Sequence, residues 1–313
     1  MNNVVVTGAN GFLAQYVVSR FASRGWHVVG VDRTPPQPRQ LQEMARFHRW
    51  PLPDPRWAAL MREQQPDLCV HCAGSASVPL SFDDPATDYR GGPALVFELL
   101  ETLRHASPRT RFLFLSSAAV YGHPARLPIT EDDTPAPISP YGINKWQAEQ
   151  LCREFANFFG LATASLRIFS AYGRGLRRQV IWDICAKLLH APAVTLQGTG
   201  AETRDFIHGQ DVAQAIECVA LQGELKGESY NVASGVETTI AEVGRRLTQL
   251  LAVQRQSRFS GTLPEGTPAR WRADIRRLET LGFRPLISLS KGLGDFVAWI
   301  REEMTWQNIS ASA

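Results

Sequence analysis

The stretch VVVTGANGFLAQYVV, residues 4–18, decides the fold of this 313-residue chain. Its first four residues are β-branched and predict a buried strand, and the pattern of an amphipathic helix follows from Phe12. Gly8 and Gly11 stand between the two, and Ala14 occupies the third position of the glycine pattern. Glycines at such a turn let backbone N–H groups approach a pyrophosphate at the positive end of the helix. The stretch therefore predicts a phosphate-binding turn.

An acidic residue ends the second predicted strand, WHVVGVD at 26–32. Asp32 follows the turn by about 20 residues, where a carboxylate can accept both ribose hydroxyls of NAD and repel the extra phosphate of NADP. The guanidinium of Arg33 beside it could accommodate that phosphate, so NADP stays open. We predict NAD as the cofactor, with Gly8, Gly11, Asp32 and Arg33 among its binding residues.

Short apolar runs alternate with helical patterns as far as about Gly173. A nearly continuous run such as DLCVHCAG, 67–74, is typical of a parallel strand buried on both faces. The alternation predicts an α/β fold with a doubly wound parallel sheet over residues 1–173, completed by parts of 203–234. Arginines, prolines and glycines increase afterwards, so residues 174–313 are expected to form mainly a smaller substrate-binding region.

The composition excludes several classes of protein. A net charge of +3 with scattered arginines gives no case for nucleic-acid binding. No run approaches the roughly 20 apolar residues of a membrane span, and the N-terminus lacks the basic head of a signal peptide, so we expect a cytoplasmic protein. Five cysteines indicate reduced thiols. Cys69 and Cys72 lie three apart in a predicted strand and point to opposite faces, so no metal site is expected.

The stretch SPYGINK, 139–145, places Tyr141 and Lys145 one helical turn apart. An ammonium beside a tyrosine stabilises its phenolate and makes it able to exchange a proton near neutral pH. Alone, the pair also fits a packed tyrosine and a solvated lysine. However, FLFLSSAAVYG predicts a central strand that ends in the Ser116 and Ser117 hydroxyls, and such strand ends line the ligand crevice of an open α/β sheet. Ser117, Tyr141 and Lys145 therefore indicate alcohol–ketone redox chemistry.

With these motifs the chain resembles the NAD-dependent nucleotide-sugar epimerase/dehydratase family of the extended short-chain dehydrogenase/reductase superfamily. TGANGFLA, HCAGSASVPLSFDDP, SSAAVYG, SPYGINK, LRIFSAYG and TRDFIHGQDVA follow one another in the order of that family. The resemblance spans nearly the whole chain. It implies a Rossmann-type fold, a nucleotide-diphosphate sugar as substrate and a homodimer formed through helices near 94–106 and 141–159.

The resemblance also implies roles for individual residues. Besides the residues already named, the cofactor contacts would be Phe12, Leu13, Cys72, Ala73, Gly74, Tyr141, Lys145 and Phe169. The substrate contacts would be Ser117, Tyr141, Ser170, Arg204, Arg270 and Asp274, with Arg204 on the diphosphate. Arg204 could instead pair with Asp205 or Asp211, and Arg272 competes with Arg270. Arginines 174, 177 and 178 are either phosphate ligands or a solvated helix start.

One departure from the family pattern bears on the reaction. Ala118 and Ala119 stand where 4,6-dehydratases carry an acid pair, so dehydration is not expected. We predict an NAD-dependent epimerase that inverts C4 of a UDP- or other NDP-hexose through a 4-keto sugar. The alternatives are an NAD(P)-dependent reductase of NDP-4-keto sugars and a non-catalytic NAD-binding regulator.

Overall fold

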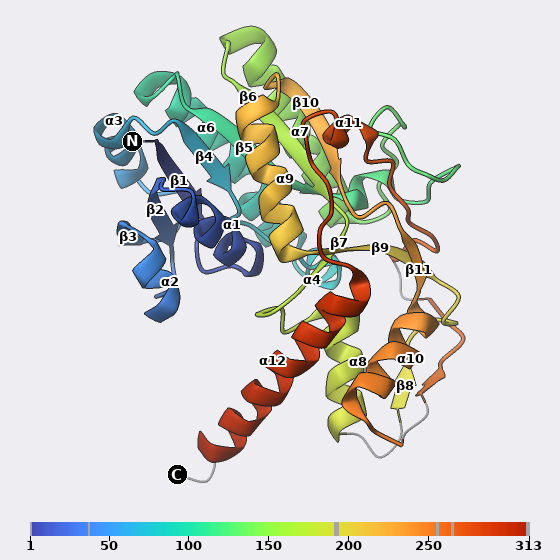
Figure 1. Cartoon of the computed structure of the whole chain (residues 1–313). Coiled ribbons are helices and arrows are strands. Elements are labelled where there is room, and N and C mark those ends of the chain that lie inside the picture. Colours follow the sequence, from blue (N-terminus) through green and yellow to red (C-terminus); the bar gives the residue numbers. More distant parts are fainter. Residues whose placement is uncertain (1, 37, 191–193, 255–256, 264–265, 311–313) are drawn as a thin grey trace.

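The computed structural model describes residues 2–36, 38–190, 194–254, 257–263 and 266–310. Figure 1 shows a large sheet with helices on its faces and, below it, a smaller group of helices and short strands. In the described residues, no helix is both long and apolar enough to cross a membrane.

The large sheet has seven parallel strands in the order β10-β6-β5-β4-β1-β2-β3. They are β1 (Asn3–Thr7), β2 (His27–Asp32), β3 (Arg46–Arg49), β4 (Leu68–His71), β5 (Arg111–Ser117), β6 (Thr163–Ile168) and β10 (Lys226–Val232). The predicted doubly wound parallel sheet is confirmed. The hydrophobic pattern does not predict β3, because RFHR is a polar edge strand without an apolar run.

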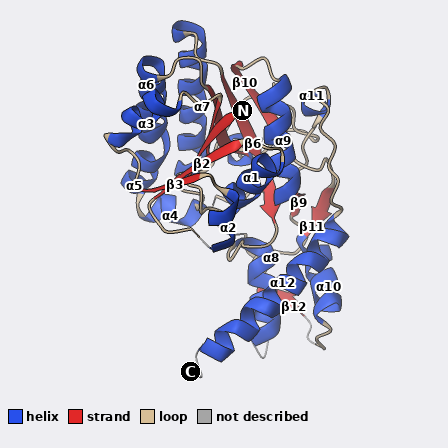
Figure 2. Ribbon diagram, turned by 60° about the vertical axis from the view of Figure 1, so that its left-hand side comes forward, coloured by secondary structure: helices blue, strands red, loops and turns tan. Residues whose placement is uncertain are grey.

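Both faces of the sheet are covered by helices, as Figure 2 shows. Valines 4 and 6 of β1 point into a core with α1 (Phe12–Ser23) and α9 (Gly209–Gln222). Val5 points the other way, into a core with α3 (Arg56–Gln64), α6 (Leu95–Ala106) and α7 (Pro140–Phe159). Because alternate residues of one strand are buried on opposite faces, the apolar runs are continuous.

Strand order reverses at β1, which lies between β2 and β4. The loops after β1 and β4 therefore leave the sheet in different directions and open a crevice at the carboxyl ends of the strands. Strand β5 ends at this edge with Ser117. The predicted end of this strand at Ser116 and Ser117 is thus where the structure has it, and residues 118–121 form a short 3-10 helix, Ala118–Tyr121.

The smaller part contains two short sheets. One joins β7 (Ser170–Tyr172), β9 (Thr203–His208) and β11 (Glu237–Thr239), and the other joins β8 (Val194–Leu196) and β12 (Ser257–Phe259). Helices α8 (Gln179–His190), α10 (Ile240–Leu251) and α12 (Leu289–Ser310) pack around a third core. The remaining helices are α2 (Pro38–Glu43), α4 (Val78–Asp83), α5 (Pro85–Tyr89), α11 (Arg276–Glu279) and a π-helical turn, Arg90–Ala94.

Candidate active site

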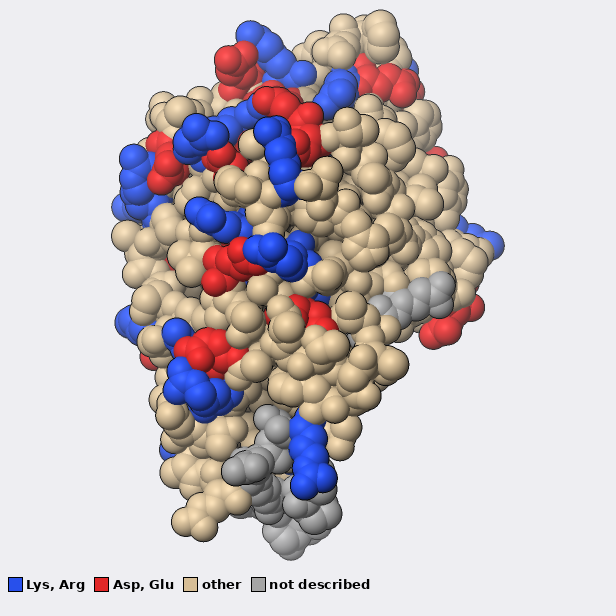
Figure 3. All heavy atoms as spheres, turned by 90° about the vertical axis from the view of Figure 1, so that its right-hand side faces the viewer, with Lys and Arg blue, Asp and Glu red and all other residues tan. Residues whose placement is uncertain are grey.

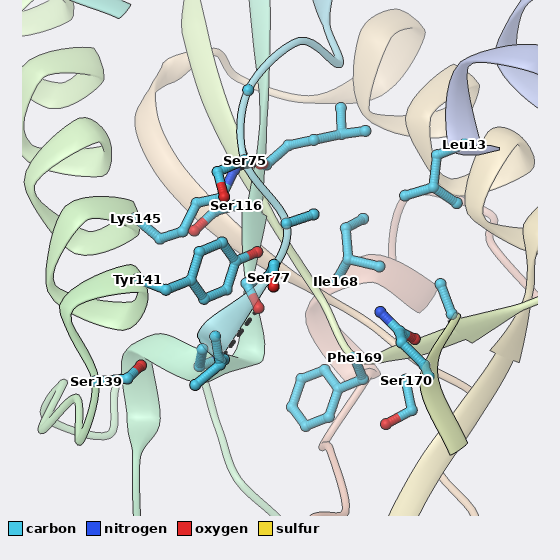
Figure 4. A pocket seen from close by; sticks show the side chains of 18 of the residues that line it. Leu13, Ser75, Ser77, Ser116, Ser139, Tyr141, Lys145, Ile168, Phe169 and Ser170 are labelled. Atoms are coloured by element: carbon cyan, nitrogen blue, oxygen red, sulfur yellow. Dashed lines mark hydrogen bonds between the residues drawn. The ribbon is translucent and has the colours of Figure 1, made fainter. Parts of the chain in front are cut away.

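A cavity of about 660 Å³ opens at the carboxyl ends of β4, β5 and β6 (Figure 4). It gathers most of the predicted site residues: Gly11, Phe12, Leu13, Cys72, Ala73, Gly74, Ser117, Tyr141, Lys145, Phe169, Ser170 and Arg204. Gly8, Asp32, Arg33, Arg270 and Asp274 are not among the residues that line it.

The glycine turn brings the start of α1 to the cavity. Gly8 has a φ of +63°, and a Cβ on it would lie 2.7 Å from the Cα and N of Ala73 in the loop after β4. The N–H of Gly11 donates to the carbonyl of Gly8 at 2.8 Å. Helix α1 begins directly after it at Phe12, so the first amides of the helix, which have no partner within the helix, can bind an anion.

Asp32 lies at the end of β2, and its carboxylate is oriented by neighbouring groups. It accepts hydrogen bonds from the Asn10 N–H at 3.1 Å and from the N–H and hydroxyl of Thr34, each at 2.8 Å. The carboxylate is thereby tied to the glycine turn. Arg33 is exposed.

Tyr141 and Lys145 lie on the same face of α7, which begins at a capped end. The Ser139 hydroxyl accepts a hydrogen bond from the Gly142 N–H at 3.1 Å, and Pro140 occupies the first helical position. Lys145 Nζ donates to the Leu115 carbonyl at 2.9 Å. The same ammonium lies 5.7 Å from the centre of the Tyr141 ring. The cap and the strand thus fix the pair at the cavity (Figure 4).

Burial changes the acidity of both groups. It raises the pKa of Tyr141 to about 12, although a hydrogen bond with Ser117 and the charge of Arg178 act in the opposite direction. Burial lowers the pKa of Lys145 to about 8, countered by the carboxylates of Asp88 and Glu149. Lys145 is thus more readily deprotonated than an ordinary lysine, and Tyr141 is a neutral phenol at neutral pH when no ligand is bound.

The two hydroxyls at the end of β5 have different partners. Ser116 donates to the buried carboxylate of Glu149 at 2.5 Å. The Ser117 hydroxyl accepts a hydrogen bond from the Ala119 N–H at 3.2 Å. Ser117 keeps its proton for donation, and it is the hydroxyl that interacts with Tyr141.

Arg204 comes to the cavity from β9 and lies over the ring of Trp271, 5.4 Å from its centre. Burial lowers the pKa of its guanidinium to about 10. Asp205 and Asp211 accept backbone N–H groups instead, and no ion pair joins either to Arg204 among the described residues. The alternative of a structural arginine paired with one of these carboxylates is therefore not supported.

Two predicted substrate contacts lie outside the cavity. Arg270 forms an ion pair with Glu237 at 2.9 Å, and Asp274 forms one with Arg276 at 2.5 Å. Trp271, next to Arg270, lines the cavity instead. No sequence pattern singles out Trp271, because a tryptophan between two arginines has no local periodicity that predicts a binding role.

The charge of the cavity differs from that of the outer surface. On the face in Figure 3, acidic and basic side chains are interspersed. Among the described residues that line the cavity, Lys145, Arg178 and Arg204 carry charge, and none is Asp, Glu or His. The cavity therefore suits an anionic ligand.

Over the described part of the chain, no group of three His, Cys, Asp or Glu could hold a metal ion, and Cys69 and Cys72 are free thiols.

Comparisons with known proteins agree with this geometry. The model of the "NAD dependent epimerase/dehydratase family" matches residues 4–233. A UDP-glucose 4-epimerase of Mycolicibacterium smegmatis is 28% identical, with 96% of this chain and 98% of that protein covered. A dTDP-glucose 4,6-dehydratase of Xanthomonas campestris is also 28% identical, covering 96% and 94%.

Among solved structures, the UDP-glucuronic acid 4-epimerase of Bacillus cereus in complex with UDP-glucuronic acid and NAD superimposes with a TM-score of 0.87. It is 26% identical and covers 96% of this chain and 99% of that one. The match to the family model extends over more than two thirds of the sequence and includes the glycine turn, Ser117, Tyr141 and Lys145. The chain therefore belongs to the NAD-dependent epimerase/dehydratase family.

Proposed function

We propose that this protein is an NAD-dependent nucleotide-sugar 4-epimerase, with a UDP-hexose as the first substrate to test. The observation that carries the proposal is the meeting of Ser117, Tyr141 and Lys145 in a cavity that also presents Arg204 and has no carboxylate among its described lining residues. Relatives and structural neighbours include UDP-sugar 4-epimerases, and this supports the choice of reaction and nucleotide.

The residues around the glycine turn fit NAD. Because Gly8 has no Cβ, the glycine turn can lie close to the backbone of the loop after β4. The first amides of α1 can bind the pyrophosphate, and Asp32 can accept hydrogen bonds from the ribose hydroxyls. Cys72, Ala73 and Gly74 would lie beneath the cofactor, and Lys145 and Phe169 would hold its nicotinamide end. When bound, NAD would accept a hydride from the sugar and return it.

Tyr141 would exchange the proton of the reaction. As C4 of the sugar gives up its hydride, Tyr141 in its phenolate form takes the proton of the C4 hydroxyl, and Ser117 donates a hydrogen bond to the same oxygen. The positive charges of Lys145 and Arg178 favour the phenolate that Tyr141 must become. After the 4-keto sugar turns over in the cavity, the hydride returns to the opposite face of C4 and Tyr141 returns the proton to the C4 oxygen, so the enzyme ends in its initial state.

The same cavity argues against dehydration. Removing water across C5 and C6 needs a base for the C5 proton and an acid for the leaving hydroxyl. Ala118 and Ala119 supply neither, and no described lining residue is Asp, Glu or His. We therefore place this chain with the epimerases, although dehydratases are equally similar in sequence.

The test is incubation of the purified protein with UDP-glucose, UDP-galactose, UDP-glucuronic acid or UDP-galacturonic acid, without added reductant. Interconversion at C4, followed by NMR, is the expected result. Conversion of a 4-keto sugar that consumes NADH or NADPH stoichiometrically, without epimerisation, would identify a reductase. A protein that binds NAD and converts none of these sugars would contradict the proposal.

We also propose a homodimer that buries the outer surface of α6 and α7. Phe97 on α6 is 42% exposed, and Trp146, Phe158 and Phe159 on α7 are 36%, 79% and 45% exposed. Large aromatic side chains gathered on two adjacent helices are typical of a protein–protein interface.

A further inference from the structure

The three arginines that follow β7 have different environments. Arg174 and Arg177 form ion pairs with Glu302 and Glu303 of α12, at 3.4 Å and 2.6 Å. Arg178 lines the cavity, and no hydrogen bond or ion pair holds its guanidinium in the part of the chain that the structure describes. Arg178 is therefore the member of the three that is available to a ligand.

The backbone around Arg178 is anchored. The Arg174 carbonyl accepts hydrogen bonds from Gln15 Nε2 and from the Tyr16 hydroxyl, both at 2.9 Å. Leu176 is buried in the third core, and Gln179, with a φ of +68°, starts α8. Since both sides of Arg178 are fixed to other elements, its side chain leaves the backbone at a defined place beside the cavity.

Arg178 lines the same cavity as Tyr141, the residue proposed to face the C4 hydroxyl. The positive charge of Arg178 also lowers the pKa of Tyr141. The other anionic groups of the proposed ligands would have their own partners, because the start of α1 is proposed for the cofactor pyrophosphate and Arg204 for the substrate diphosphate. A neutral hexose would leave the guanidinium of Arg178 without a counter-charge, whereas a carboxylate can accept two parallel hydrogen bonds from it.

The walls of the cavity suit such a group. Eight described residues that line it carry a hydroxyl group: Ser75, Ser77, Ser116, Ser117, Ser139, Tyr141, Ser170 and Thr267. The Ser75 hydroxyl is buried and has no hydrogen-bond partner among the described residues. Figure 4 places it on the side of Ser116 and Lys145. A hydroxyl-rich wall next to an unpaired guanidinium can hold both the hydroxyls and the carboxylate of an acidic sugar.

We infer that Arg178 binds a carboxylate on the sugar, and that this enzyme prefers a nucleotide-linked hexuronic acid to a neutral hexose. The inference rests on the proposed nucleotide-sugar function and adds the class of sugar to it. Arg178 would then determine specificity, and the catalytic proton transfer would stay with Tyr141.

Titration calorimetry on the NAD-saturated protein tests the inference with three probes. UDP carries only the diphosphate, UDP-glucose adds a neutral hexose, and UDP-glucuronic acid adds the carboxylate. The unmodified protein should bind UDP-glucuronic acid more tightly than UDP-glucose. Arg178→Gln should weaken UDP-glucuronic acid about ten- to a hundredfold and leave UDP and UDP-glucose unchanged. Arg177→Gln is the matched control and should change none of the three, because Arg177 pairs with Glu303.

Other outcomes of these titrations, and of an NAD titration of Arg178→Gln, would overturn the inference. Equal weakening of all three probes by Arg178→Gln would assign the arginine to the diphosphate, and loss of NAD affinity alone would assign it to the cofactor. Unchanged binding of every ligand would give Arg178 no part in recognition. If the unmodified protein binds none of the UDP probes, the proposed function itself fails; if it binds UDP-glucose as well as UDP-glucuronic acid, only the inference fails.

Discussion

Glu149 of α7 and Arg167 of β6 form a buried ion pair, with the Arg167 Nη2 and Glu149 Oε2 atoms 2.8 Å apart. The Glu149 carboxylate also accepts the Ser116 hydroxyl, and Arg167 also donates to the Tyr121 hydroxyl at 2.8 Å. Glu149 follows Lys145 by one helical turn. The ion pair therefore links the helix that carries Tyr141 and Lys145 to β6, and the hydrogen bond from Ser116 links the same helix to β5, which ends at Ser117.

Breaking this pair should destabilise the protein strongly. Glu149→Gln leaves the Arg167 guanidinium buried without its counter-charge, and we expect the free energy of unfolding to fall by about 3–5 kcal/mol. Urea denaturation followed by circular dichroism measures the change. Asp183→Asn, which breaks the exposed pair with Lys187 on α8, is the control and should cost about 1 kcal/mol or less. Equal effects of the two substitutions would contradict the structural role of Glu149.

Tyr141→Phe should abolish most of the epimerase activity while the protein stays folded. Loss of the proton-exchanging hydroxyl is expected to lower kcat by roughly 10²–10⁴, with little change in the affinity for NAD or UDP. Turnover followed by NMR and ligand titrations measure the two effects separately. Tyr89→Phe, at an exposed tyrosine of α5, should retain full activity. A Tyr141→Phe enzyme that retains its kcat would exclude Tyr141 as the proton acceptor.

The lowered pKa of Lys145 gives a pH dependence of stability with a defined sign. The pKa is about 8 in the folded protein and near 10.5 in the unfolded chain. Between pH 8 and pH 10.5 the unfolded state binds more protons at Lys145 than the folded state does. The free energy of unfolding therefore rises with pH across this range, and the gain is lost again as the pH falls through 8. Relative to Lys145→Met, the unmodified protein should gain about 1–3 kcal/mol between pH 7 and pH 10. Urea denaturation of both proteins across this range checks it, and a constant difference would contradict the shift.

The sequence predicted the parts of the site that depend on local spacing. Gly8 and Gly11 lie in one strand–turn–helix unit, and Tyr141 and Lys145 lie one turn apart on one helix, so their proximity follows from backbone geometry alone. The large sheet was predictable for the same reason, since its central strands are continuous apolar runs.

Long-range contacts were not predictable from the same patterns. Arg174, Arg177 and Arg178 look alike in the sequence, and they differ only because Glu302 and Glu303, more than 120 residues later, pair with the first two. Trp271 enters the cavity because its backbone N–H donates to the carbonyl of Thr203, which brings it beside Arg204. Such pairings depend on how distant segments of the smaller part pack against one another, and no local sequence pattern predicts this packing.

A single charge on α7 should separate the proposed dimer. Phe158→Glu places a carboxylate where a 79% exposed aromatic ring is proposed to be buried between two copies. We expect the mass from light scattering to fall from that of a dimer to that of a monomer. Leu286→Glu, at a 71% exposed position away from α6 and α7, should leave the mass unchanged. A monomeric unmodified protein, or a Phe158→Glu protein that stays dimeric, would contradict this interface.

Gly8→Ala and Gly25→Ala form a matched pair for the cofactor turn. Both glycines have positive φ, +63° and +76°, so an alanine at either position carries a similar backbone strain of about 1 kcal/mol. Only at Gly8 would the added Cβ meet other atoms, since it would lie 2.7 Å from the Ala73 backbone, whereas at Gly25 no atom lies within 4 Å. Ala73 adjoins Cys72 and Gly74, the residues proposed to lie beneath NAD, so forcing the loop aside should weaken NAD binding about tenfold or more. Gly25→Ala should have only the effect of the backbone strain. Its free energy of unfolding in urea should fall modestly, and its affinity for NAD in a fluorescence titration should be unchanged. If both variants bind NAD like the unmodified protein, the close approach of the two loops is not needed to form the cofactor site.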